Sequence, residues 1–342
     1  MTERILLLAS HAVAEFDDLR MFTDLGYDTF CPGGYEVPGR APEGIRPPLA
    51  DTPAHPDLVA RLQETRAEYG DPGPLIDAGK ARLHPDIIDW ADAIIVHHFP
   101  RQWIGGQWDR IKHKRVIWRT CGQSDLSLER DMAPYRSERL QIVRYSPAEA
   151  RYFESFGCFA GEDALIRFGK YPEDYGPWIG DDPMVGNITQ DMAKRGDATG
   201  LSFWEAATDG LPVRPAGPSS EMLRGGLGTL PYEAMLEYLR HIRAYLYTGT
   251  VPASYTLGLI EAMLSGVPVV SIGPKAWGFP LLFEASEIVE LSAEGPAEAH
   301  RFLQEILNDQ RLATEMSIIT RERALERFDI ATVSEAWQAF LS

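Results

Sequence analysis

The chain has 342 residues, of which 44% are hydrophobic and 24% are charged, and its formal net charge is −17. This composition is typical of a globular protein and disfavours a disordered chain. The length predicts two domains of about 150 residues each, because a single hydrophobic core rarely serves so long a chain. The acidic excess opposes nucleic-acid binding by the surface as a whole, since that binding needs clustered Lys and Arg.

The amino-terminal segment "MTERILLLASHAVAEF" has only a short apolar run, and acidic residues follow it closely. That pattern is typical of neither a signal peptide nor a membrane span. Cys31, Cys121 and Cys158 lack C-x-x-C spacing and are odd in number, so we expect neither a disulfide framework nor a zinc site. The sequence therefore predicts a cytoplasmic protein without a membrane span.

Strand-like runs alternate with helical patterns along the chain, which predicts parallel βαβ units in an α/β fold. In the first half we expect strands at 5–10, 93–98, 115–120 and 140–146, and helices at 55–69 and 147–157. The segment 31–56 is dense in Pro and Gly and predicts a long loop. Loops of that length are often functional, and an ordinary surface excursion explains the segment equally well.

Pro and Gly residues between 172 and 183 indicate a linker, after which the pattern starts again. Further strands are expected at 184–190, 211–217, 243–249, 267–273 and 287–292, with an amphipathic helix at 329–342. We predict an amino-terminal domain over 1–178, a second domain over 179–325, and a carboxyl-terminal helical segment over 326–342 that packs back toward the first domain.

A basic segment stands out in the acidic chain. Residues 101–150 contain ten Lys or Arg against six Asp or Glu, and the densest part is "RIKHKRVIWR" at 110–119. A charge run of this kind is most often a solvated helix end. The alternative is a surface for an anionic acceptor.

The segment "YTGTVPASYTLGLIEAML" predicts a strand that ends near Gly249, a short loop, and a helix that opens around Ser254 to Thr256. In open α/β sheets, ligands bind at the carboxyl ends of the strands, where helix N-termini attract anions. Phosphate is therefore the expected ligand. Glu261 lies further along the same helix, where its carboxylate suits a ribose diol, although a mid-helix Glu is usually solvated.

The stretch "PASYTLGLIEAMLSGVPVVSIG" resembles the donor-site signature of GT-B glycosyltransferases, particularly those of the family-4 type. Segments at 146–157, 164–175, 185–196 and 227–249 agree with that family in the same order. The resemblance implies two Rossmann-like α/β domains that face each other across a cleft. The first would bind the acceptor and the second the nucleotide sugar.

The resemblance also implies a set of donor-binding residues. Glu261 would bind the ribose, and the backbone around Tyr255, Thr256 and Leu257 would hold the diphosphate. Lys194 and Arg195 are nearby cations suited to neutralising the leaving group. The full expected donor set is Glu261, Ser254, Tyr255, Thr256, Leu257, Asn187, Lys194, Arg195 and Gly217.

Two positions depart from the family pattern. Ala253 stands eight residues before Glu261, where the family has a first glutamate that contacts the sugar. Asn187 takes the position of a family arginine. Both departures leave the donor sugar and the mechanism at the anomeric carbon open.

Candidate catalytic residues follow the strands of the first domain. His11 comes after the first strand, where a βα loop would face the cleft, and a general base for a hydroxyl acceptor needs such a position. A lone His is nevertheless more often structural than catalytic. The expected catalytic residues are His11, Asp17, Asp18 and His97, and the expected acceptor-binding residues are His98, Arg119, Gly122 and Gln123.

The leading hypothesis is a hexosyl- or pentosyltransferase that moves a sugar from a nucleotide donor, most simply UDP-linked, to a hydroxyl acceptor. That acceptor is a saccharide, a small molecule or a modified DNA base. No D-x-D motif occurs at a suitable place, so we expect neither a metal nor a cofactor. Three alternatives stay open: a bacteriophage-type DNA glycosyltransferase acting on flipped hydroxymethylated pyrimidine, a nucleotide-sugar 2-epimerase, and a non-catalytic nucleotide-binding relic that lacks the Ala253 carboxylate.

Overall fold

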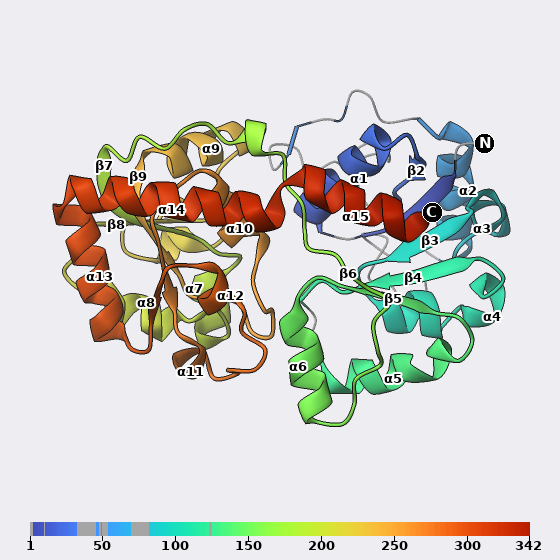
Figure 1. Cartoon of the computed structure of the whole chain (residues 1–342). Helices are drawn as coiled ribbons and strands as arrows, with labels where there is room; N and C mark the ends of the chain where they lie inside the picture. The colour runs from blue at the N-terminus through green and yellow to red at the C-terminus, as the bar shows by residue number, and fades with distance from the viewer. Residues whose placement is uncertain are drawn as a thin grey trace. The chain divides into compact units, whose positions relative to one another are not determined.

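The computed structural model describes residues 3–9, 11–32, 46–47, 49, 54–69, 82–122 and 125–342. Most of the loop expected at 31–56 lies outside the described residues. The chain divides into two compact units, unit 1 with residues 1–169 and 333–342, and unit 2 with residues 170–332. Each contains a parallel sheet flanked by helices, which confirms the α/β prediction (Figure 1).

The described part of unit 1 contains a parallel sheet with the strand order β2-β1-β3-β4-β5-β6. Its strands are β1 (Arg4–Leu8), β2 (Asp28–Phe30), β3 (Ala93–Val96), β4 (Arg115–Arg119), β5 (Gln141–Arg144) and β6 (Ala164–Leu165). The four strands predicted for this half are present. The sequence analysis missed β2 and β6, because runs of three and two residues are too short to show an apolar period.

Before residue 170, the described part of unit 1 contains the helices α1 (Ala12–Asp24), α2 (Pro56–Tyr69), α3 (Pro85–Trp90), η1 (Arg101–Gly105), α4 (Trp108–Ile111), α5 (Leu126–Arg136) and α6 (Pro147–Ser155). Side-chain caps fix the starts of three of these helices, and the His84 ring nitrogen, which accepts from the Asp86 N–H, caps α3. Asp125 accepts a hydrogen bond from the Ser127 N–H before α5, and Ser146 does the same for the Ala148 N–H before α6. Such caps satisfy amides that have no acceptor within the helix.

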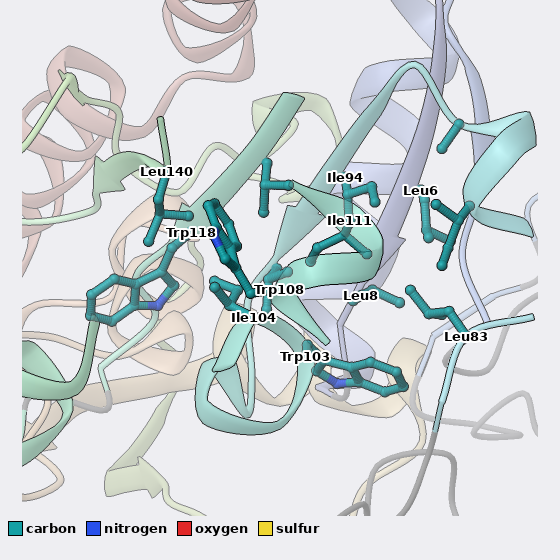
Figure 2. Close-up of a cluster of buried hydrophobic side chains, with 14 of the residues drawn as sticks. Leu6, Leu8, Leu83, Ile94, Trp103, Ile104, Trp108, Ile111, Trp118 and Leu140 are labelled. Atoms are coloured by element: carbon teal, nitrogen blue, oxygen red, sulfur yellow. The ribbon is translucent and has the colours of Figure 1, made fainter. Parts of the chain in front are cut away.

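A buried cluster covers one face of the unit 1 sheet. Alternate strand residues such as Leu6 and Leu8 point to the same side, as the two-residue period of a strand requires. Figure 2 shows them in one cluster with Ile94 of β3 and with Trp103 and Ile111 of the η1–α4 segment. Burial of these apolar side chains holds β1, β3 and β4 beneath the helices, at about 25 cal/mol per Å² removed from water.

Unit 2 has the strand order β11-β10-β9-β7-β8, with all neighbouring strands parallel. The strands are β7 (Asp182–Ile188), β8 (Val213–Ala216), β9 (Ile242–Tyr247), β10 (Val269–Ile272) and β11 (Leu291–Ala293). The α-helices are α7 (Met192–Arg195), α8 (Leu201–Ala207), α9 (Tyr232–His241), α10 (Leu257–Leu264), α11 (Pro274–Trp277), α12 (Ala285–Ile288), α13 (Pro296–Asn308) and α14 (Gln310–Phe328).

The predicted strand at 287–292 is wrong in its first part. Residues 285–288 form α12, and the strand β11 covers only Leu291–Ala293. A short apolar run fits a buried helical turn as well as a strand, so the pattern did not distinguish the two.

The carboxyl-terminal helical segment consists of two helices. α14 ends at Phe328, and α15 (Ile330–Leu341) follows after Asp329 (Figure 1). Residues from Val333 onward belong to unit 1, where the Trp337 ring lies 5.3 Å from that of Phe22. Among the described residues, no helix combines the length and the apolarity needed to cross a membrane.

Candidate functional site

The strand order of unit 2 indicates the edge of the sheet at which a ligand site is expected. β7 is the first strand of this sheet, with β8 on one side and β9 on the other. The chain therefore reverses its direction of travel across the sheet between β7 and β9. Open α/β sheets bind ligands at such a switch point, outside the carboxyl ends of the strands. The loop after β7 and the loop that joins β9 to α10 border this point.

Close backbone packing brings the predicted donor residues to this edge. An ideal Cβ on Gly258 of α10 would lie 3.2 Å from the Ile188 carbonyl oxygen at the end of β7. Gly217, which follows β8, has φ +105°, and a Cβ there would lie 2.7 Å from the Thr189 carbonyl oxygen. Only glycine combines that dihedral with that approach. The α10 N-terminus and the loop after β8 therefore both pack against the end of β7.

The N-terminus of α10 presents amides to this edge. Thr256 precedes the helix in an extended conformation, with φ −122° and ψ 160°, and its side chain makes no capping hydrogen bond. The first N–H groups of a helix have no acceptor within it, and the helix dipole adds positive potential there. The Leu257 and Gly258 amides are therefore suited to an anion such as a phosphate.

The residues just before the helix are buried. Ser254 is fully buried and Tyr255 is 2% exposed, with the Tyr255 ring 5.4 Å from that of Phe328. Their side chains anchor the loop inside unit 2. Any contact that this segment makes with a ligand therefore falls to its backbone, as the sequence analysis expected for Tyr255.

Glu261 is buried and paired with a lysine that the sequence analysis did not identify. The Lys170 Nζ donates a hydrogen bond of 2.9 Å to Glu261 Oε1, and the two side chains are 1% and 6% exposed. Lys170 is the first residue of unit 2, and its backbone N–H donates to the Phe328 carbonyl at 2.8 Å. The pairing could not be predicted from a local sequence pattern, because the two residues are 91 positions apart in the chain.

The other predicted donor residues differ in their surroundings. Asn187 is 1% exposed inside β7, where its Nδ2 donates to the Leu246 carbonyl at 2.7 Å. That hydrogen bond gives Asn187 a structural role between β7 and β9. Lys194 is 65% exposed, with its Nζ 3.6 Å from an Asp191 carboxylate oxygen, and Arg195 is also exposed on α7. These two cations therefore lie on the helix that follows β7.

Unit 1 gathers histidines and an aspartate at the carboxyl edge of its sheet. β1 and β3 are adjacent parallel strands, so the residues that follow them meet. His97 Nε2 lies 3.1 Å from Asp18 Oδ2 of α1, and both side chains are buried. The ring of His98 stacks on that of His11 at 6.4 Å with an interplanar angle of 11°. His11 is the exposed member of this group, and Asp17 is 6% exposed.

The geometry around His98 makes it a neutral histidine. Burial, together with the neighbouring charges of His97 and His11, lowers its pKa from 6.5 to about 3. Desolvation disfavours the imidazolium, and nearby histidines add repulsion when they are protonated. His98 therefore carries no charge near neutral pH, where its ring nitrogens act as one donor and one acceptor.

This pKa predicts a specific pH dependence of stability. The folded state takes up the His98 proton only near pH 3, whereas the unfolded chain takes it up near 6.5, so the free energy of unfolding falls as the pH drops below 6.5. Between pH 7 and pH 5 the loss from this group is about 2 kcal/mol. We therefore expect the free energy of unfolding of His98→Gln, measured with urea at pH 7 and pH 5, to fall by about 2 kcal/mol less than that of the original protein.

The exposed His113 supplies a matched control for this experiment. The variant His113→Gln should keep the pH dependence of the original protein. Equal pH dependence in the His98 variant and the original protein would contradict the assignment of a strongly lowered pKa to His98.

The predicted acceptor residue Arg119 occupies a structural position instead. Its side chain is fully buried, donates to the Ile166 carbonyl and to the Arg167 carbonyl at 3.0 Å, and lies 4.5 Å above the Phe168 ring. We therefore leave Arg119 out of the proposed site. The sequence does not distinguish an arginine at the end of a strand whose side chain is buried from one whose side chain is exposed.

The loop after β4 contains the remaining predicted acceptor residues. Gly122 has φ +81°, and Gln123 lies outside the described residues. Cys121 Sγ donates to the His97 carbonyl oxygen at 3.3 Å, which ties this loop to the histidines. Burial raises the pKa of the Cys121 thiol to about 12, so it stays protonated and is not a nucleophile near neutral pH.

Comparisons with known proteins bear on the fold. No protein-family model matches the chain, and no curated protein matches it. Among solved structures, it is similar to sucrose-phosphate synthase from Thermosynechococcus elongatus, with 15% identity, a TM-score of 0.68, and coverage of 99% of this chain and 98% of that one. It is equally similar to Anabaena HepE in complex with UDP and glucose, with 14% identity, a TM-score of 0.68 and 99% coverage of both chains.

A third similar structure is a DNA-modifying β-glucosyltransferase, with 12% identity, a TM-score of 0.53 and 98% coverage of both chains. These similarities extend over nearly the whole chain. They confirm the prediction of a GT-B glycosyltransferase fold.

Proposed function

We propose that this protein is a metal-independent glycosyltransferase that moves a hexose or pentose from a UDP-sugar to a hydroxyl acceptor. The observation that carries the proposal is the N-terminus of α10 at the switch point of unit 2, which has no side-chain cap, with Glu261 in the next turn. Support also comes from Anabaena HepE, a similar structure that was determined with UDP-glucose as well as with UDP and glucose.

In the proposed reaction, the donor diphosphate accepts hydrogen bonds from the Leu257 and Gly258 amides. The bond between the sugar's anomeric carbon and the diphosphate oxygen breaks, and UDP leaves with the electron pair. Lys194 and Arg195 stabilise the charge on this leaving group. Glu261 accepts a hydrogen bond from the ribose while Lys170 holds its carboxylate in place.

The acceptor would bind at the carboxyl edge of the unit 1 sheet. Its hydroxyl oxygen forms the new bond to the anomeric carbon and loses a proton in doing so. We assign the removal of that proton to His11, because His11 is the exposed histidine of the group and follows β1 directly. The neutral His98 ring stacks on His11 and limits its orientations.

A DNA base is the second candidate acceptor. The similarity to the DNA-modifying β-glucosyltransferase favours it, as does the basic segment 110–119. Residues 112–115 of that segment, however, precede or begin β4 and therefore lie at the opposite edge of the sheet from His11, and Arg119 at the other end of β4 is buried. A hydroxylated saccharide or small molecule thus remains the leading acceptor.

The role of the α10 amides is testable with a pair of variants at Leu257. Proline suits the first helical position, and the extended Thr256 is the conformation that a residue before proline prefers. Leu257→Pro therefore removes one N–H with little backbone change, whereas Leu257→Ala shortens the side chain and keeps the N–H. We expect the Kd for UDP, measured calorimetrically, to be about tenfold higher in the proline variant than in the alanine variant. Equal Kd values would contradict the diphosphate role.

The activity itself is tested by UDP release from a panel of UDP-sugars. Each donor is offered alone, with saccharide or small-molecule alcohols, and with DNA that contains hydroxymethylated pyrimidine. Release that one acceptor stimulates would identify both substrates. UDP binding without release from any donor would refute the transferase proposal in favour of a nucleotide-binding relic.

A further inference from the structure

A basic pocket of about 580 Å³ lies at the amino edge of the unit 1 sheet. Arg115 begins β4 and Gln141 begins β5, and both line the pocket. At about 3.3 Å per residue, the five residues of β4 separate this edge from the carboxyl edge by roughly 13 Å. The basic side chains that line the pocket include part of the basic segment noted in the sequence, and they are Lys112, His113, Lys114, Arg115, Arg136 and Arg139.

Two of these cations are held in place by neutral groups. The Lys114 Nζ donates to the backbone carbonyls of Asp89 and Ala91 at 3.0 and 2.8 Å. The Arg115 guanidinium donates to the carbonyls of Phe340 and Leu341, both at 2.6 Å, at the end of α15. Carbonyl partners fix the side chains but cancel no full charge. Lys114 and Arg115 thus supply positioned positive charge to the pocket.

Two other cations have acidic partners. Arg136 is paired with Asp163, whose carboxylate also accepts the Ile142 N–H at 2.7 Å. Lys112 lies 2.7 Å from Asp109 on an exposed surface, where such a pair contributes little. Arg136 is therefore largely neutralised, while Lys112 is readily available to another anion.

Arg139 is the most distinctive member of the pocket. It is exposed and has φ +80°, a left-handed conformation that arginine rarely adopts. No ion pair is found for its side chain among the described residues. His113 is also exposed at the rim and likewise forms no ion pair among the described residues.

We propose that this pocket binds a small phosphate-bearing ligand. Lys114, Arg115 and Arg139 supply three charges that no acidic group in the pocket neutralises, and the planar guanidinium group of arginine matches phosphate oxygens. The volume lies in the range of small-molecule sites. A net charge of −17 opposes a long polyanion, whereas a small anion meets only the local charge. This site is separate from the proposed donor site in unit 2.

Calorimetric titration with inorganic pyrophosphate tests the proposal. Arg139→Gly removes the charge and places at φ +80° the residue that best tolerates it, so the midpoint of thermal unfolding should stay equal or rise. We expect this variant to bind pyrophosphate about tenfold more weakly or worse. His113→Ala, at the rim of the pocket, should weaken binding to a smaller extent.

Two further variants locate the bound pyrophosphate. Arg311→Ala removes an exposed arginine of α14 and should leave binding unchanged. Arg195→Ala removes a cation at the proposed donor site. If this variant binds pyrophosphate more weakly while Arg139→Gly binds it as the original protein does, the pocket proposal is overturned. Failure of UDP binding would not bear on the pocket, because no residue of unit 2 lines it.

The source of the phosphate is distinguished with two other probes. A 20-base-pair DNA duplex and vesicles that contain phosphatidylglycerol are tested with the original protein and with Arg139→Gly. A small soluble ligand would be refuted if the original protein bound the duplex or the vesicles but not pyrophosphate, and if Arg139→Gly abolished that binding. Pyrophosphate binding that needs Arg139, without binding of either polyanionic surface, supports it.

Discussion

Replacing Glu261 with leucine should lower the free energy of unfolding by about 3–5 kcal/mol, because the buried Lys170 ammonium would lose the carboxylate that lies 2.9 Å from it. Lys170→Met should be similarly costly, since the buried Glu261 carboxylate would lose the ammonium group that lies 2.9 Å from it. The double variant Lys170→Met/Glu261→Leu replaces the pair with apolar groups of similar volume and leaves neither charge unpaired. It should be less destabilised than the sum of the single variants by about 2–3 kcal/mol.

Urea unfolding of the four proteins measures this coupling. The exposed pair Arg301 and Glu305 of α13, with an N–O distance of 3.0 Å, is a control within the same unit. Its alanine cycle should give a coupling below about 1 kcal/mol. Additive effects at Lys170 and Glu261 would show that the buried contact makes no energetic link.

The same cycle separates the structural role of Glu261 from its proposed role in binding. A single Glu261 variant could lose UDP affinity merely because the buried Lys170 loses this carboxylate partner, whereas the double variant removes both charges of the pair. We expect the double variant to bind UDP about tenfold more weakly than the original protein, because a ribose hydroxyl loses its charged acceptor. Unchanged affinity would contradict ribose binding by Glu261 and leave the α10 amides as the remaining donor contact.

His11→Ala should lower kcat by about 10²–10⁴-fold while leaving the Kd for UDP unchanged. The loss follows from the assignment of His11 as general base. His11 belongs to unit 1, whereas the proposed donor contacts belong to unit 2, so nucleotide binding should not respond. Although His11 is the N-cap residue of α1, its side chain makes no capping hydrogen bond, so the helix should not be weakened.

Steady-state kinetics with the donor and acceptor identified from the UDP-release panel give this comparison. His113→Ala is the matched control, because it removes another exposed histidine of unit 1 at the opposite edge of the sheet. A kcat for His11→Ala within about threefold of the control would rule out the base assignment. A loss that appears only in the Kd for UDP would instead place His11 in donor binding.

Much of the fold was predictable from the sequence because local patterns encode it. Apolar runs bounded by turn residues located β1, β3, β4, β5, β7, β8, β9 and β10 to within a few residues. The same reading failed for β2 and β6, which are too short to show a period, and for 287–292, where a helical turn precedes the strand.

The candidate site was predictable in part for the same reason. The start of α10 and the presence of Glu261 within it follow from a loop, an apolar helix and a glycine turn that are contiguous in the chain. The inward orientation of Arg119 was not predictable, because its carbonyl partners Ile166 and Arg167 come from a segment more than 40 residues later.

The alternation of strands and helices, the position of α10 and the concentration of basic residues at 110–119 all follow from the sequence alone. These depend on periods of two to four residues and on local composition. The packing of each unit, in contrast, brings Lys170 to Glu261 and Asp18 to His97, and it gathers residues 112–115 in a pocket at the amino edge of the unit 1 sheet. Those contacts depend on which strands become neighbours, and strand order results from the packing of the whole unit.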